Sequence, residues 1–231
     1  MIFWVIFTLL SFGLLTTLSR GPWVGAACIV ICYFFIANKA AKNLAKLGLV
    51  TFLALVIISF SPIGQRFINL LPYFSQNAET HATSTITYRE KLFEQSWKVI
   101  QQNPFFGSPN YLLTPEMEEM RQGEGIIDVV NSYLAIAMEI GLVGLCLYLL
   151  IFLTILVKLK KNLTRLTKTK EHDHLWNQGR IIFSTIVGIM VILYTTGNSI
   201  IPKYYTWSLI GLATVFIALS RQKLIAHLAI K

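Results

Sequence analysis

Two arginines, Arg20 and Arg89, stand where a guanidinium group could bind an anion. Arg20 lies in the stretch TLSRGPWVGA, residues 17–26, at the seam between two apolar runs. Pro22 suits the first turn of a helix and Gly21 leaves room for close approach, so this stretch combines a cation with a helix N-terminus. The competing interpretation is an arginine that snorkels from the end of a membrane span.

Arg89 lies in an amphipathic helix that the periodicity of TITYREKLFEQSWKVIQQ predicts over residues 85–102. It falls on the apolar stripe, and a cation in the first turn also opposes the helix dipole. An anion bound by the guanidinium and by the free amides of the helix start would remove both conflicts. A partner carboxylate, such as Glu79 or Glu124, would remove them too. The predicted apolar stripe comprises Ile86, Phe93, Trp97 and Ile100.

The end and the polar face of this helix also follow from the sequence. Asn103-Pro104 is expected to end it, because a residue that precedes proline disfavours the helical conformation. Glu94 and Lys98 are four residues apart and should form a favourable ion pair. The polar face comprises Glu90, Lys91, Glu94, Lys98 and Gln101.

A further charged residue, Glu139, lies about two turns into an apolar run that begins near residue 131. A carboxylate inside a membrane is costly and is a functional candidate by default. The alternative interpretation is a buried partner for an arginine such as Arg20.

The composition of the 231 residues predicts an all-α integral membrane protein. The chain is 55% hydrophobic and only 13% charged, whereas soluble domains carry about 25% charged residues. Several apolar runs approach or exceed the roughly 18 residues that cross a bilayer as a helix. The three cysteines lie inside such runs without metal-ligand spacing, so no metal site is expected. The expected spans are 1–18, 22–37, 47–61, 131–157, 181–199 and 205–220.

The distribution of basic residues predicts how the chain crosses the membrane. Most of the 20 basic residues lie in the connector after residue 37, in a basic loop at 158–180 and in the tail at 221–231. By the positive-inside rule these segments and both termini are cytoplasmic. Spans 1–3 then lie within 1–61, and spans 4–6 lie within 131–220.

Residues 62–130 form the single large extracytoplasmic loop in this topology, with the helix near 85–102 inside it. Within the basic loop, leucines alternate with lysines and are expected to lie against anionic lipid. These are Leu159, Leu163 and Leu166.

Three segments together resemble the O-antigen ligase/polymerase superfamily of bacterial envelope glycosyltransferases. They are SRGPWVG at 19–25, YREKLFEQSWKVIQQNPFFG at 88–107 and NSYLAIAMEIGLVG at 131–144. Their order, their spacing and their common side of the membrane make the combination fairly specific. The resemblance implies a GT-C-related membrane fold. It also implies a metal-independent, inverting transfer of glycans carried on undecaprenyl diphosphate, with no cofactor.

The resemblance also implies roles for individual residues. The two outer-face arginines of the family, which hold the diphosphate, correspond to Arg20 and Arg89. Tyr88 precedes Arg89 in the second segment and is grouped with it as substrate-binding. Asn131 would bond the donor sugar or orient a base. The base is expected among three carboxylates, in order of preference Asp128, Glu124 and Glu139.

Two departures from the family pattern shape the expected function. Ligases of the family typically have a histidine directly before the asparagine of the third segment, and this chain has Val130 there. That difference favours a polymerase over a ligase. Family members usually have more spans than the six expected here, so the chain resembles their C-terminal half.

The function expected from these features is a polymerase-type glycosyltransferase for O-antigen, capsule or exopolysaccharide, at the outer face of the bacterial plasma membrane. The alternatives are a ligase that moves glycan onto lipid A core or protein, and a non-catalytic membrane fragment. The expected partners are the lipid-linked oligosaccharide, an acceptor glycan or lipid A core, and membrane lipid. A chain-length regulator or a missing N-terminal half would be protein partners. No feature points to nucleic acid.

Overall fold

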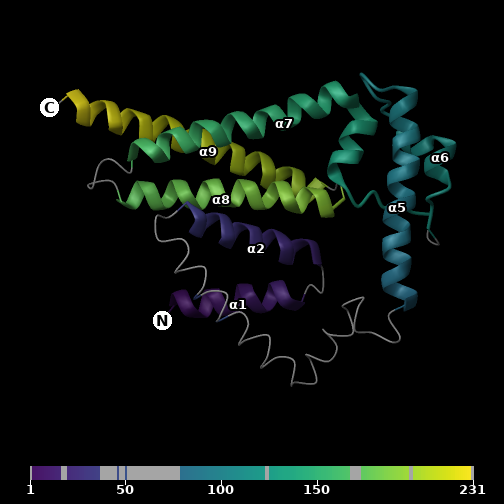
Figure 1. The fold of residues 1–231 in the computed structure, drawn as a ribbon, viewed down its shortest axis with the longest axis horizontal. Helices are drawn as coiled ribbons and strands as arrows, with labels where there is room; N and C mark the ends of the chain where they lie inside the picture. The colour runs from purple at the N-terminus through teal and green to yellow at the C-terminus, as the bar shows by residue number, and fades with distance from the viewer. Residues whose placement is uncertain are drawn as a thin grey trace.

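The computed structural model describes residues 2–16, 20–36, 46, 50, 79–122, 125–166, 173–197 and 200–229. All regular structure within these ranges is helical, as the composition predicts. Figure 1 shows most of the helices running in roughly the same direction as a bundle, with α5 lying across one end. The elements are α1 (Ile2–Thr16), α2 (Arg20–Phe35), α5 (Glu79–Gln102), η1 (Tyr111–Leu113), α6 (Pro115–Glu118), α7 (Ser132–Leu166), α8 (Asp173–Thr195) and α9 (Ile200–Ala229).

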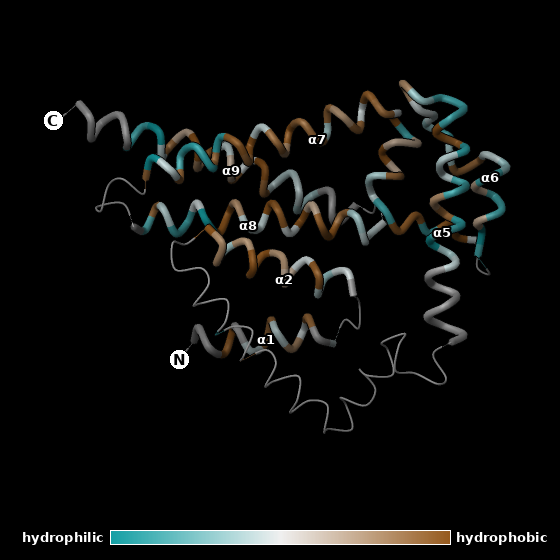
Figure 2. Tube along the Cα trace, in the orientation of Figure 1, coloured by the Kyte–Doolittle hydropathy of each residue, from teal (hydrophilic) through white to brown (hydrophobic). Residues whose placement is uncertain are grey.

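Two helices in the described part of the chain, Ser132–Leu166 and His174–Thr195, are long and apolar enough to cross a membrane. They correspond to the expected spans 131–157 and 181–199. Helices α1 and α2 are apolar but only 15 and 16 residues long. Helix α9, which contains the expected span 205–220, is not among the helices that are long and apolar enough. The expected span 47–61 lies outside the described residues, so the number of six spans stays a prediction. Hydrophobic residues dominate the middle of α7 and α8, and hydrophilic residues gather on α5 and α6 (Figure 2).

The bundle is held together by a core between α7, α8 and α9. Phe152, Ile186 and Phe216 are among its buried members. Helix α2 packs closely on α8 through small residues. A Cβ added at Gly25 would overlap the Ile192 side chain of α8, so glycine allows the two backbones to approach.

The basic segment 158–180 is mostly helical and not an extended loop. Residues 158–166 continue α7 and residues 173–180 begin α8. The leucines expected to face lipid are instead 0–4% exposed, because the continuous helix turns them toward the bundle. The prediction of a lipid-bound face is therefore wrong for Leu159, Leu163 and Leu166.

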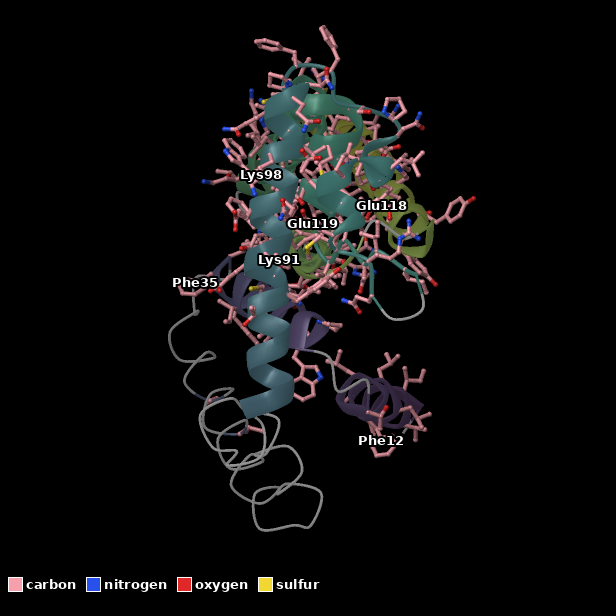
Figure 3. All side chains as sticks on the ribbon, turned by 90° about the vertical axis from the view of Figure 1, so that its right-hand side faces the viewer. Phe12, Phe35, Lys91, Lys98, Glu118 and Glu119 are labelled. Atoms are coloured by element: carbon pink, nitrogen blue, oxygen red, sulfur yellow. The ribbon has the colours of Figure 1, made fainter. Side chains whose placement is uncertain are left out.

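Helix α5 ends at Gln102, directly before Asn103-Pro104, as the sequence predicts. It begins at Glu79, earlier than predicted. Arg89 therefore lies well inside α5, and the prediction that it shares an anion with the free amides of the helix start is wrong. The predicted ion pair is also present, with 3.2 Å between Lys98 Nζ and Glu94 Oε1. Figure 3, viewed from the α5 side, shows Lys91 and Lys98 on α5 with Glu118 and Glu119 beside it, which makes this surface rich in charge.

The buried face of α5 agrees with the predicted apolar stripe at Ile100 and differs from it at Phe93 and Trp97, while the side chain of Ile86 lies outside the described residues. Phe93 and Trp97 are 56% and 46% exposed, whereas Leu92 and Val99 are almost fully buried. Leu92, Val99 and Ile100 also recur at helical spacing, and they pack in one core with the first turns of α7. Contact with α7 therefore selected one of two apolar faces that the sequence offers.

Helix α7 changes direction at Gly141, whose φ of 74° and ψ of −179° are not helical. Residues 132–140 run beside α5, and residues 142–166 enter the bundle (Figure 1). Gly107, with φ 66°, closes the turn after α5 against the same point. A Cβ at Gly107 would lie 2.6 Å from Met138 O, and a Cβ at Gly141 would overlap the backbone carbonyl of Phe105.

Three backbone hydrogen bonds join the turn after α5 to the break in α7. They satisfy amides and a carbonyl that the interrupted helix cannot pair internally. We call this arrangement, with Gly107 and Gly141 at its centre, the glycine lock. The bonds are Ser108 N to Met138 O (2.8 Å), Leu142 N to Pro104 O (2.8 Å) and Val143 N to Phe105 O (3.3 Å).

Replacing Gly141 with alanine should destabilise the chain more than the same change at Gly211. Gly141 has dihedral angles almost restricted to glycine, at a cost of about 1–3 kcal/mol for other residues. A Cβ at Gly211, in α9, has nothing within 4 Å. Thermal unfolding of the purified chain in detergent would measure both changes, and equal midpoints for the two variants would contradict the glycine lock.

Candidate functional site

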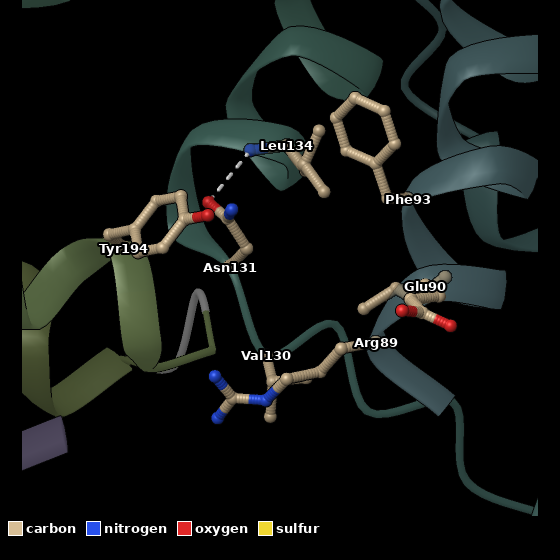
Figure 4. A pocket seen from close by; sticks show the side chains of 8 residues that line it. Arg89, Glu90, Phe93, Val130, Asn131, Leu134 and Tyr194 are labelled. Carbon is tan, nitrogen blue, oxygen red and sulfur yellow. Dashed lines mark hydrogen bonds between the residues drawn. The ribbon is translucent and has the colours of Figure 1, made fainter. Parts of the chain in front are cut away.

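A cavity of about 350 Å³ lies between α5, the residues that precede α7, and the end of α8. It opens at the end of the bundle that α5 covers. Figure 4 shows its lining, with Arg89 and Phe93 reaching in from α5 and Tyr194 facing them from α8. The lining residues are Arg89, Glu90, Leu92, Phe93, Val130, Asn131, Leu134 and Tyr194.

Arg89 extends from the first half of α5 across the cavity toward Val130 (Figure 4). Its guanidinium makes no hydrogen bond or ion pair with any residue that the structure describes. Of the expected carboxylate partners, Glu124 and the side chain of Glu79 lie outside the described residues. The side chain offers a forked donor set to the cavity, and such a set matches the oxygens of a phosphate or carboxylate.

Asn131 faces the same cavity and also begins α7. Its Oδ1 accepts hydrogen bonds from the backbone amides of Tyr133 (3.0 Å) and Leu134 (3.3 Å). An asparagine at this position satisfies amides that lack a partner at a helix start. Asn131 therefore has a structural role beside any role in binding, and its amide group remains at the cavity wall.

The first turns of α7 are tied to the end of α8. Ser132 Oγ donates to Thr196 O (2.9 Å), and Tyr133 Oη donates to Met190 O (2.7 Å). These bonds satisfy carbonyls near the C-terminus of α8. They hold the α7 wall of the cavity against the α8 wall.

Tyr88 connects α5 to the segment that leads into α7. Its hydroxyl donates to the backbone carbonyl of Asp128 at 2.9 Å. Burial, together with the negative charge of Asp128, raises the pKa of Tyr88, so the hydroxyl remains a donor at neutral pH. Tyr88 does not line the cavity, and it fixes the distance between Arg89 and the opposite wall.

Of the three predicted base candidates, the two that the structure describes, Asp128 and Glu139, are not brought together at the cavity. The Asp128 carboxylate lies beside Gly197, past the end of α8, with Oδ1 3.3 Å from where a Cβ of Gly197 would be. Glu139 lies on the α5 side of the break in α7, where its charge helps burial to raise the pKa of Tyr111. Neither carboxylate lines the cavity, and Glu124 lies outside the described residues.

Arg20 is the first residue of α2, and its side chain lies outside the described part. The next residue, Gly21, is buried against α8, where an added Cβ would overlap the Thr195 side chain. Thr195 follows Tyr194, which lines the cavity. The segment that carries Arg20 and the cavity that contains Arg89 therefore meet at the same end of α8.

The structure adds residues that the sequence did not single out. Glu90 lines the cavity beside Arg89 and is also exposed, as expected for the polar face of the predicted helix. Its position next to Arg89 in the sequence was the only available signal. Tyr194 and Leu134 come from other helices, and only the packing of α8 against α7 brings them to the cavity.

Comparison with known proteins identifies the family. The family model described as O-antigen ligase matches residues 5–149. The chain belongs to the O-antigen ligase family. No curated protein and no solved structure matches the chain.

The family match confirms the resemblance and the expectation of a membrane protein. It extends from α1 into α7 and so includes every residue that lines the cavity except Tyr194. Members of the O-antigen ligase family are glycosyltransferase-like enzymes. Within the described residues, no group of three His, Cys, Asp or Glu side chains could hold a metal ion.

Tyr88→Phe should lower the free energy of unfolding by about 1 kcal/mol, the typical net contribution of a hydrogen bond. The loss relative to the original chain should be present below the unfolded-state tyrosine pKa of about 10. It should fade as the pH rises through the raised pKa of folded Tyr88. Denaturant unfolding of the detergent-solubilised chain at a series of pH values would measure this.

Tyr204→Phe is the matched control for Tyr88→Phe, because Tyr204 is 70% exposed. It makes no hydrogen bond with the residues that the structure describes. An equal loss in both variants would show that the Tyr88 hydroxyl does not support the cavity wall.

Proposed function

We propose that this member of the O-antigen ligase family is a polymerase-type glycosyltransferase. It extends a glycan carried on undecaprenyl diphosphate at the outer face of the plasma membrane. The observation that carries the proposal is Arg89, a cation without a partner among the described residues, which lines a cavity at the end of an apolar helix bundle. A substrate that joins a diphosphate to a long hydrocarbon chain fits this arrangement, because the diphosphate suits the Arg89 cation and the hydrocarbon suits the apolar helix bundle.

In the proposed reaction, an acceptor sugar hydroxyl attacks the anomeric carbon of the donor. The bond from that carbon to the diphosphate oxygen breaks, with inversion, and the diphosphate leaves with added negative charge. Arg89, which is exposed at the cavity, would stabilise that charge together with Arg20 from the start of α2, as preorganised cations do. Asn131 would bond the donor sugar or orient the base.

A carboxylate near the cavity would take the proton from the attacking hydroxyl. Glu90 is the first candidate because it lines the cavity with Arg89, and geometry comes before pKa in choosing a general base. Asp128 is the second, since it lies two residues before Val130 in the wall. Glu124 and Glu139 remain further candidates.

The proposed membrane orientation puts α5 and the cavity outside the cell. Basic side chains gather at the opposite end of the bundle, where α7 ends and α8 begins, and the positive-inside rule assigns such an end to the cytoplasm. The N-terminus of α1 and the C-terminus of α9 point to that end too (Figure 1). The basic residues include Lys158, Lys160, Lys161, Arg165, Arg180, Arg221 and Lys223.

The alternative within the same family is a ligase, which the family description itself favours. Val130 supports the polymerase, because it lines the cavity where ligases of the family typically have a histidine. Glycan analysis of a strain that lacks the protein distinguishes the two. Loss of a polymerase leaves single repeat units on the acceptor, whereas loss of a ligase leaves polymer on the lipid carrier. An unchanged glycan pattern would favour a non-catalytic fragment.

Arg89→Ala should lower polymer yield about 100-fold or more, the usual effect of removing one group that stabilises developing negative charge. Arg89→Lys should recover part of the yield, because lysine keeps the charge but loses the forked donors. The yield and length of surface polysaccharide would be measured in the producing cell, with equal membrane levels of each variant.

Lys91→Ala is the matched control, since Lys91 is exposed on the same helix and does not line the cavity. Its polymer yield should equal that of the original chain. A normal yield with Arg89→Ala would refute the proposed role of the cavity.

Glu90→Gln should reduce polymerisation about 100- to 10,000-fold, in the range for loss of a general base. Asp128→Asn should reduce it less, because Asp128 does not line the cavity. Glu94→Gln is the control, since it removes an exposed carboxylate one turn further along α5. Initial rates of polymerisation with lipid-linked donor in membranes would be measured for each variant. A larger loss with Asp128→Asn than with Glu90→Gln would identify Asp128 as the base.

A further inference from the structure

We infer that Phe105 and Phe106, in the turn between α5 and the break in α7, insert into the membrane leaflet on the α5 side of the bundle. They would set the depth at which α5 and the cavity lie relative to that leaflet. The inference goes beyond the proposed function, and it holds whichever side of the membrane α5 occupies.

The first observation is the exposure of these two side chains. Phe105 is 66% exposed and Phe106 is 81% exposed, the highest value among the large apolar side chains of the described residues. A phenyl ring that faces water at this extent is unfavourable, and two in succession form an apolar projection.

The second observation is that the turn cannot withdraw the rings. The glycine lock holds it through Val143 N to Phe105 O (3.3 Å) and the neighbouring bonds. Gly107 N also bonds to Asn103 O at 2.9 Å, which closes the turn on its own side. The backbone that carries both rings is therefore held by hydrogen bonds in a position where the rings lie outside the packed core.

The third observation is continuity with a surface that already suits lipid. Phe105 lines an apolar groove of about 420 Å³ whose other members all belong to α7. That part of α7 lies directly after the break and within a helix that is long and apolar enough to cross a membrane. Leu147 and Leu150 are 58% and 56% exposed there. The groove residues are Phe105, Leu142, Val143, Cys146, Leu147 and Leu150.

This continuity identifies lipid as the partner. The exposed side of α7 faces hydrocarbon once the helix crosses the bilayer, because no described element covers it. Phe105 extends that side past the end of the apolar helix, where aromatic side chains are favoured at the boundary between hydrocarbon and headgroups. The other occupants that would cover this surface are a second copy of the chain or another segment of it. The experiment below distinguishes them from lipid.

Spin labelling of the full chain in liposomes tests the inference. A nitroxide would be attached to Phe106→Cys in a background where Cys28, Cys32 and Cys146 are alanine. Collision with oxygen, which concentrates in lipid, would be compared with collision with a water-soluble nickel chelate. Leu150→Cys serves as the lipid-facing reference and Lys91→Cys as the water-facing one.

The inference predicts that the label at 106 resembles the label at 150, with oxygen collisions in excess over nickel collisions. A label at 106 that resembles the one at 91 would overturn it, because the ring would then face water. Shielding from both reagents would also overturn it and would point to a protein partner. If Phe106→Cys is not recovered folded, a label at Phe105→Cys in the same background gives the same comparison.

Discussion

The contact of two backbones at Gly107 and Gly141 determines the relative positions of the other parts of this protein. Each glycine has a positive φ, and each lacks a side chain at the point where the other backbone segment passes close to it. The hydrogen bonds of this glycine lock replace those that the interrupted α7 would have made within itself. With the lock in place, α5 packs along the first turns of α7, and Arg89 faces Asn131 across a defined space.

The cavity combines a rigid frame with a charge that the frame does not neutralise. Asn131 begins α7, Tyr88 joins α5 to the opposite wall, and Ser132 joins that wall to α8. These bonds are made by groups beside Arg89 and not by Arg89 itself. The proposed function would need such a separation, because a site that binds and releases an anion needs an available cation and a frame whose polar groups are satisfied.

The sequence predicted features that depend on local interactions. The end of α5 at Asn103-Pro104 and the ion pair of Glu94 with Lys98 follow from neighbours within one or two turns, and both are confirmed. The prediction that the segments of Arg20 and Arg89 lie near each other rested on the family resemblance, which relates residues that are distant in the sequence. The side chain of Arg20 and the expected span 47–61 stay untested predictions.

Features that depend on packing between distant segments could not be predicted in the same way. Phe93 and Leu92 are equally apolar, and only contact with α7 decides that Leu92 is buried. Glu90 is exposed like its polar neighbours, and only the position of α5 beside α7 puts it at the cavity. The break at Gly141 lies inside a run in which Glu139 is the only charged residue, and the run does not show that the helix changes direction there.

Helix α7 is at once a wall of the cavity and a candidate membrane span, with one stiff joint between the two parts. A bilayer that is thinner than the span is accommodated by helix tilt. Because the glycine lock resists bending at Gly141, residues 132–140 move together with residues 142–166 when that part of α7 tilts. Helix α5 is joined to α7 by the glycine lock and to the segment before α7 by the Tyr88 hydrogen bond, so Arg89 and Asn131 move together and lipid thickness changes the position of the whole cavity relative to the bilayer.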